Sequence, residues 1–249
     1  MFGQEGPERI LEKEIHSDRV DSIQWANQGL RFISGSKDGT ALLWRYERGE
    51  WRTIRLRMST RLAGQPSSAG DVIASNNSSA NGSNGSGGNG SQSSNSSNQN
   101  AAVVENANDD GGDAESRLQK LKVTMVTWSR DDRWLITAVS DFSVKVWDSS
   151  TGVLRQELRG HESETFVLEP HPHDPNILLS AGHDGRLLVW DLARGQVVKS
   201  FLNFIEGQGH GAVFDAKWNP SGSTIAATDS HGHLSIYGIG NRTFLLFQL

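Results

Sequence analysis

The sequence predicts an all-β fold built from four-stranded antiparallel sheets that repeat along the chain. Short runs of branched and aromatic residues alternate with turns that contain Gly, Asn or Asp, which is typical of β-meanders. Four aromatic landmarks recur at steps of 103, 43 and 47 residues: Trp44, Trp147, Trp190 and Tyr237. Because sheets with a period of about 40 to 45 residues form the blades of a β-propeller, we expect a partial propeller of about four blades.

The best-preserved copy of the repeat covers residues 160–191, GHESETFVLEPHPHDPNILLSAGHDGRLLVWD. It opens with Gly-His, passes an Asp-Gly turn and closes on Trp-Asp, which is the signature of a WD-repeat blade. In this spacing the Asp can hold the imidazole, the imidazole can meet a hydroxyl, and the hydroxyl can accept the indole N–H. We call this set the polar lock of a blade. Here it consists of His161, Ser180, Asp184 and Trp190.

The other copies keep the polar lock to different degrees. The first copy has the complete set His16, Ser34, Asp38 and Trp44, and the second keeps Thr137, Asp141 and Trp147. The second copy has no His at the expected place near Gln119, and Phe142 replaces the turn Gly, so we expect a weaker lock.

The fourth copy follows Gly209-His210 and departs furthest from the pattern. Ala227, His231 and Tyr237 stand where the other copies have the hydroxyl, the Asp and the Trp. We therefore expect the polar lock of this copy to be largely lost.

The predicted blades cover residues 16–61, 118–159, 160–208 and 209–249. We expect residues 1–15 to form the outer strand of a preceding, incomplete blade, and the apolar run TFLLFQL to form an atypical outer strand of the last one. Residues 62–117 are predicted to be a disordered insertion, because 75–100 contain only Ser, Asn, Gly, Gln and one Ala. The closure entropy of such a loop rises slowly with its length, so the blades tolerate it.

Four blades are at the lower end of the range for closed propellers. Terminal repeats without a neighbour expose apolar faces, so we expect an open half-ring that is completed by missing blades, a partner or a second copy. A tight closure of four blades is the alternative.

Composition and charge exclude several classes of protein. The chain is 35% hydrophobic with a mean hydropathy of -0.49 and a net charge of -5, and it contains no Cys. Without a signal peptide, an 18-residue apolar run or cysteines, we expect an intracellular protein that does not span a membrane. The absence of a basic excess predicts no direct binding of nucleic acid.

No constellation of residues predicts a catalytic, metal or cofactor site. The pairs His171/His173 and His231/His233 would bind zinc only if both pairs met, and histidines satisfied within turns are favoured. The Gly-rich run 206–215 lacks the Lys-Ser/Thr of a phosphate loop and precedes a strand, so we expect a flexible loop. We therefore predict a non-enzymatic protein.

Four runs, VTMVTW, SAGHDG, EGQGHGAVFD and TDSHGHL, resemble the WD-repeat region of the bromodomain and WD-repeat proteins, the group of the pleckstrin-homology-domain-interacting protein. The resemblance covers about residues 10–60 and 120–240. It implies a nuclear scaffold that binds chromatin-associated proteins and takes part in transcription regulation and in control of cell shape and the cytoskeleton. The family's full form has further repeats and tandem bromodomains, so the sequence resembles a form truncated at both ends, and acetyl-lysine reading is not carried over.

Two alternatives to the chromatin scaffold stay open. The resemblance also implies a substrate receptor of a cullin-type ubiquitin ligase, with the ligase adaptor as partner. The family's docking motif is Trp-Asp-x-Arg, whereas Trp190-Asp-Leu-Ala-Arg194 places the Arg one residue late. The third hypothesis is a truncated product without independent activity.

Overall fold

The computed structural model describes residues 9, 12–62 and 121–238. The predicted disordered insertion lies outside the described residues except for its first position, and so does the apolar C-terminal run. All regular structure in the described part is β, which confirms the predicted class. The described residues contain no helix that is long and apolar enough to cross a bilayer.

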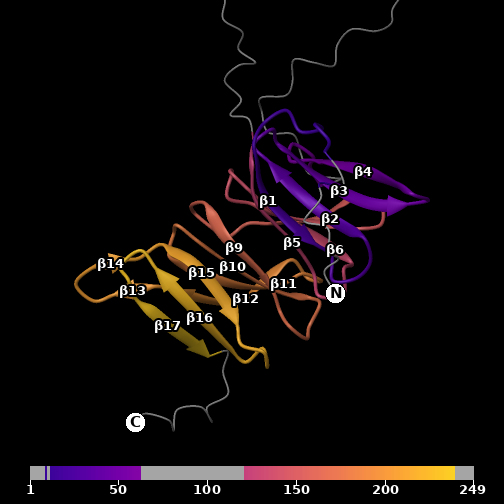
Figure 1. Ribbon diagram of the computed structural model, residues 1–249. Coiled ribbons are helices and arrows are strands. Elements are labelled where there is room, and N and C mark those ends of the chain that lie inside the picture. The colour runs from indigo at the N-terminus through magenta and orange to yellow at the C-terminus, as the bar shows by residue number, and fades with distance from the viewer. Residues whose placement is uncertain (1–8, 10–11, 63–120, 239–249) are drawn as a thin grey trace, which may run out of the picture. The chain divides into compact units, whose positions relative to one another are not determined.

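The strands form successive antiparallel meanders, in which each strand pairs with the next one along the chain (Figure 1). Blade 1 contains β1 (Val20–Trp25), β2 (Arg31–Ser36), β3 (Thr40–Glu47) and β4 (Glu50–Arg57), and blade 2 contains β5 (Val123–Trp128), β6 (Trp134–Val139), β7 (Val144–Asp148) and β8 (Leu154–Leu158). Blade 3 contains β9 (Thr165–Pro170), β10 (Ile177–Gly182), β11 (Arg186–Asp191) and β12 (Gln196–Leu202), and blade 4 contains β15 (Val213–Trp218), β16 (Thr224–Asp229) and β17 (Leu234–Gly238).

Between blades 3 and 4 the chain forms a short hairpin where a flexible loop is expected. Its strands are β13 (Phe204–Ile205) and β14 (Gly209–His210). Gly207 and Gly209 have φ angles of +78° and +82°, which glycine adopts without steric strain, so the chain reverses within a few residues. The Phe204 and His210 rings meet across the hairpin with their centroids 5.5 Å apart.

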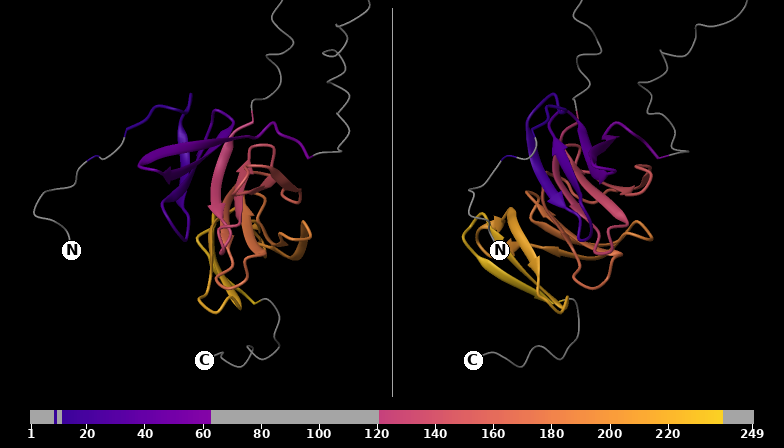
Figure 2. Two further views of the ribbon diagram at one scale, coloured as in Figure 1. Left: turned by 90° about the vertical axis from the view of Figure 1, so that its right-hand side faces the viewer. Right: turned by 45° about the vertical axis from the view of Figure 1, so that its right-hand side comes forward.

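The apolar core lies between neighbouring sheets, in three clusters that each join two consecutive blades. The third-strand Trp of a blade packs against the preceding blade. Trp147 belongs to the cluster that contains Ile33 and Leu43 of blade 1, and Trp190 belongs to the cluster that contains Val146 of blade 2. Figure 2 shows the sheets of blades 2 and 3 between those of blade 1, in purple, and blade 4, in yellow.

The described residues before His16 differ from the sequence prediction. Residues 9 and 12–15 are not part of a strand. The hydrogen bonds between this segment and β4 involve the side chains of Lys13 and Arg55, not a backbone ladder. The rest of the predicted outer strand over 1–15 lies outside the described residues.

Candidate functional site

The polar lock of blade 3 joins all four residues that the sequence singles out. His161 Nδ1 lies 2.9 Å from Asp184 Oδ2, His161 Nε2 lies 2.7 Å from Ser180 Oγ, and the Trp190 indole donates to Ser180 Oγ at 2.7 Å. A carboxylate only accepts, so His161 donates from Nδ1 to Asp184, and this tautomer leaves Nε2 to accept from the Ser180 hydroxyl. The four side chains therefore satisfy one another away from water.

Blade 1 repeats this arrangement with the predicted residues. His16 lies 2.9 Å from both Asp38 Oδ2 and Ser34 Oγ, and Trp44 donates to Ser34 Oγ at 2.9 Å. Burial alone would raise the pKa of Asp38, but hydrogen bonds from Thr40, His16 and the Ser17 amide outweigh it and hold that pKa well below the ordinary value. The pKa of Asp184 in blade 3 is likewise lowered, because hydrogen bonds from His161 and backbone amides outweigh its burial.

In blade 2 the structure brings together only two of the three predicted residues. Trp147 donates to Thr137 Oγ1 at 3.1 Å, and the Thr137 hydroxyl in turn donates to Met58 Sδ at 3.5 Å. Asp141 instead accepts from Ser143 at 2.6 Å and from Arg159 at 3.5 Å. No described His side chain lies in this lock, so Asp141 does not hold an imidazole ring in place as Asp38 and Asp184 do.

A buried ion pair ties blade 2 to the segment that follows β4. Lys145 Nζ donates to Glu157 Oε2 and to the carbonyl of Thr60, both at 2.9 Å. Burial raises the pKa of Glu157, but Lys145 and Arg159 outweigh this and lower it overall. Sequence reasoning missed Met58 and Lys145, because a thioether and a lysine carry no recognisable spacing within a WD repeat.

Blade 4 has a lock, but of different residues, which corrects the expectation that it is largely lost. Tyr237 donates to Asn203 Oδ1 at 3.2 Å, and Asn203 Nδ2 donates to Asp229 Oδ2 at 2.9 Å. The longer reach of Tyr237 replaces both the indole and the missing hydroxyl at Ala227. His231 contributes only its backbone amide, which donates to Asp229 at 3.0 Å.

In this fourth lock the pKa of Asp229 is lowered, and His210 lies outside the lock. Burial would raise the pKa of Asp229, but hydrogen bonds from Asn203 and from the His233 and His231 amides lower it to about 2. His210 of the Gly-His pair is exposed in the hairpin and takes no part.

Neighbouring blades are also joined at their first hairpin turns. Buried Asp132 of blade 2 accepts from the backbone amides of Asn27 and Gln28 in blade 1, each at 2.8 Å, and from Arg31 at 3.3 Å. Arg130 donates to the carbonyl of Pro172 in blade 3 at 2.9 Å. These contacts fix the orientation of each blade relative to the next.

Two of the histidines considered for zinc, His171 and His173, join blades 3 and 4 by hydrogen bonds. His171 Nε2 lies 3.1 Å from the carbonyl of Gly222, and His173 Nε2 lies 2.8 Å from that of Pro220. His233 instead bonds to Asp229, in the β16–β17 turn. Within the described ranges, no group of three or more His, Asp or Glu is placed to hold a metal ion.

Arg194 lies at the surface of blade 3. It is the arginine that follows Trp190-Asp191 one position later than the Trp-Asp-x-Arg docking motif requires. Its guanidinium donates to Asp191 Oδ2 at 2.6 Å, and its side chain is 77% exposed. The pKa of Asp191 is lowered, because hydrogen bonds from Arg194 and from backbone amides outweigh burial.

The comparison with protein families gives the class of the chain. Residues 8–45, 116–148, 152–191 and 199–237 match the WD40 family, described as WD domain, G-beta repeat. The chain belongs to this family. Proteins of this class are typically non-enzymatic scaffolds that bind other proteins, so the locked blades define a protein-interaction scaffold.

Several relatives and one solved structure show the same repeat. A bromodomain and WD repeat-containing protein of Dictyostelium discoideum is 24% identical over 94% of this chain and 9% of its own length. Protein transport protein sec31 of Aspergillus fumigatus is 34% identical over 48% of this chain and 10% of its own length. Methylosome protein WDR77 of Xenopus laevis is 30% identical over 45% of this chain and 33% of its own length. The chain thus spans about a tenth to a third of the length of these relatives.

The fold is similar to that of the computationally designed Ika4 protein. The TM-score is 0.56 at 18% identity, over 94% of this chain and 100% of the designed one. This likeness concerns the fold alone.

Proposed function

We propose that the chain is the WD-repeat part of a chromatin-associated bromodomain and WD-repeat protein. In this role it is a nuclear, non-enzymatic platform on which chromatin-associated proteins assemble, with effects on transcription and on cell shape. The observation that supports this proposal is the extent of one similarity. The match to the Dictyostelium protein covers 94% of the chain, whereas the sec31 and methylosome matches cover 48% and 45%.

The local structure of blade 4 also supports this assignment. Two sequence runs, EGQGHGAVFD and TDSHGHL, carry most of the family resemblance. The first contains the turn and second strand of the β13–β14 hairpin and the start of β15, and the second contains the turn around Asp229. The second run supplies Asp229 of the Tyr237–Asn203–Asp229 lock, whereas Asn203 and Tyr237 lie just outside the two runs. Both runs thus belong to blade 4 and to the hairpin that leads into it.

A docking role agrees with the chemistry of the described residues. The His and Asp side chains of the locks are held by structural hydrogen bonds, so they are not free to exchange protons with a substrate. Apolar side chains remain at the surface instead, including Phe204 on the β13–β14 hairpin, which is 62% exposed. Rigid blades that carry exposed loops are suited to binding partners.

Proximity labelling in living cells tests the proposal. We expect the tagged chain to accumulate in the nucleus and to label histones and chromatin-associated proteins. A Trp190→Ala variant, in which blade 3 is destabilised, is the control and should lose this labelling. Exclusion from the nucleus, or labelling of cytoplasmic proteins only, would refute the chromatin assignment.

The same experiment separates the ligase alternative. Strong labelling of a cullin adaptor that disappears in Arg194→Ala would indicate a substrate receptor. Arg159→Ala is the matched control, since Arg159 is an exposed arginine that also pairs with an acidic residue of its own blade.

A further inference from the structure

The three internal junctions between blades bury the same positions of the repeat. On the face that receives the next blade, strand register aligns two third-strand positions that are buried in every internal junction: Ala41 and Leu43, Val144 and Val146, and Leu187 and Val189. In blade 4 the same register places Leu234 and Ile236 at these positions. They are 70% and 66% exposed, although their counterparts are in the core.

The opposite face of the repeat shows the same difference at the other end. Two first-strand positions enter the junction with the preceding blade, and they are buried in blades 2 and 4 as Val126 and Trp128, and as Ala216 and Trp218. Blade 1 has Ile23 and Trp25 at these positions, exposed by 60% and 53%. Both ends therefore present apolar residues that an internal junction would cover.

The two exposed faces are complementary in hydrogen bonding as well. Trp128 donates its indole N–H to the carbonyl of Gln24 in blade 1 at 3.1 Å, and Trp218 donates to that of Glu169 in blade 3 at 3.3 Å. Register places the Lys217 carbonyl at this acceptor position in blade 4. Among the described residues, Trp25 is the corresponding indole without a preceding blade.

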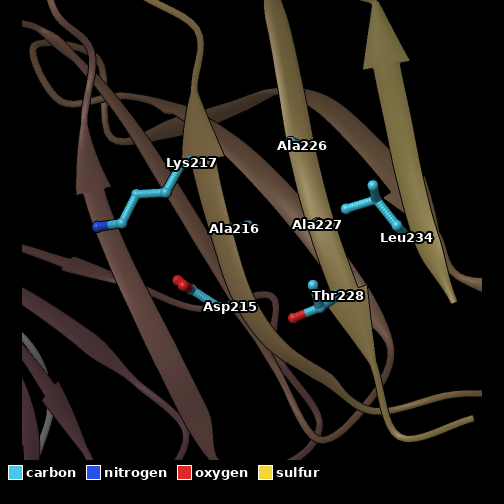
Figure 3. Close-up of a pocket in the computed structure, with 7 residues that line it drawn as sticks. All are labelled: Asp215, Ala216, Lys217, Ala226, Ala227, Thr228 and Leu234. Atoms are coloured by element: carbon cyan, nitrogen blue, oxygen red, sulfur yellow. The ribbon is translucent and has the colours of Figure 1, made fainter. Parts of the chain in front are cut away.

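The exposed face of blade 4 is hollowed where the next blade would enter. A shallow depression of about 130 Å³ is lined by Asp215, Ala216, Lys217, Ala226, Ala227, Thr228 and Leu234 (Figure 3). In blade 1, Gly35 occupies the register position of Thr228, and a Cβ on Gly35 would lie 2.7 Å from Val126 of blade 2. Thr228, at the depression, thus stands where Gly35 meets Val126, the counterpart of Ile23, in an internal junction.

We propose that the blade 4 face of one copy of the chain binds the blade 1 face of a second copy, in the arrangement of the internal junctions. The second copy supplies both features that the depression lacks, an apolar first strand and an indole donor. The four described blades of each chain give eight blades in a pair, which is the upper end of the range for closed propellers. A head-to-tail contact that occurs twice in this way makes a ring and covers both described end faces of each copy.

Light scattering after size exclusion tests this arrangement with two variants of the whole chain. Ile23→Glu and Thr228→Lys place charges at positions that meet across the proposed contact. Val198→Glu is the control, because Val198 is exposed on the outer half of blade 3 and away from both faces. We expect the wild-type chain and the control to have twice the monomer mass of 27.2 kDa. Each face variant alone should weaken association by roughly a hundredfold or more, because it buries an unpaired charge.

Mixing the two face variants separates a head-to-tail contact from other arrangements. One interface of the mixed pair is wild type and the other joins Glu to Lys, so we expect the mixture to recover the dimer mass. Recovery also requires that both variants be folded. A monomeric wild-type chain, a mixture that stays monomeric, or a Thr228→Lys variant that dimerises normally would each overturn the proposal.

Discussion

The hydroxyl of Tyr237 lies 3.2 Å from Oδ1 of Asn203, and through Asn203 it is linked to the carboxylate of Asp229. In blades 1 and 3 the same function is performed by Trp, Ser, His and Asp. The requirement on a WD blade is therefore that the buried polar groups of the third strand, the second strand and the preceding loop satisfy one another. The identity of the residues can change when their reach and hydrogen-bonding capacity are preserved.

The blade 4 lock predicts two graded losses of stability. Tyr237→Phe removes one hydrogen bond and should lower the free energy of unfolding by about 0.5 to 1.5 kcal/mol. Asn203→Ala removes one of the donors to the buried Asp229 carboxylate and leaves the Tyr237 hydroxyl without its acceptor, so it should lower the free energy of unfolding by about 1 to 3 kcal/mol. Urea denaturation followed by tryptophan fluorescence measures both. Tyr46→Phe, at an exposed tyrosine, is the control and should have no effect, and an equal result for Tyr237→Phe would contradict this lock.

The blade 3 lock predicts a larger loss when the indole itself is removed. Trp190 is only 1% exposed, so Trp190→Ala should lower the free energy of unfolding by about 3 to 5 kcal/mol. Asp184→Ala should lower it by about 1 to 3 kcal/mol, because buried donors lose their acceptor. Asp141→Ala in blade 2 offers a comparison, since that carboxylate does not meet a histidine. If thermal melts show equal losses for Asp184→Ala and Asp141→Ala, the polar lock is not what stabilises the blade.

The contact between the first two blades predicts a local effect. Asp132→Ala leaves the amides of Asn27 and Gln28 without their acceptor. We expect a loss of about 1 to 3 kcal/mol and faster hydrogen exchange at these two amides. Asp131→Ala is the matched control, because Asp131 accepts only from Ser129 and Arg133 within its own turn. Unchanged exchange at Asn27 in the Asp132→Ala protein would argue against the contact.

Acid should destabilise the protein through the carboxylates of the locks. The pKa of Asp229 is about 2 in the folded chain, below its ordinary value of 3.8, so the unfolded chain binds more protons between these values. The contribution of Asp229 to stability is therefore complete above about pH 4 and is lost as the pH falls through the folded pKa. Urea midpoints measured from pH 5 to pH 2 should fall less steeply for Asp229→Asn than for the wild-type chain. Identical slopes would show that Asp229 is not the group responsible.

The repeat period and the residues of two locks could be predicted from the sequence for a physical reason. Trp, Ser and His must meet across adjacent strands, which fixes their separation within a blade and makes it visible as spacing. Asn203 was missed because the β13–β14 hairpin lies between it and the first strand of its blade, and the nearby Gly209-His210 pair matched the usual pattern.

The contacts between blades could not be predicted from the sequence, because their partners lie far apart along the chain. Asp132 meets Asn27 across 105 positions of the chain, and Met58 meets Thr137 across 79. Nothing in the local pattern of a turn Asp or a Met indicates such a partner. The insertion remains a prediction, because residues 63–117 fall outside the described part of the chain.

Exchange of the tryptophan indole protons with deuterium, followed by nitrogen-edited NMR, tests most directly whether these sheets are blades held by polar locks. The indoles of Trp44, Trp147 and Trp190 each donate to a hydroxyl oxygen at 2.7 to 3.1 Å in a buried position. The structure predicts that these three indole protons exchange only as the protein unfolds, and that Ser180→Ala speeds exchange at Trp190 alone. Exchange of all three at the rate of a free indole would contradict the account.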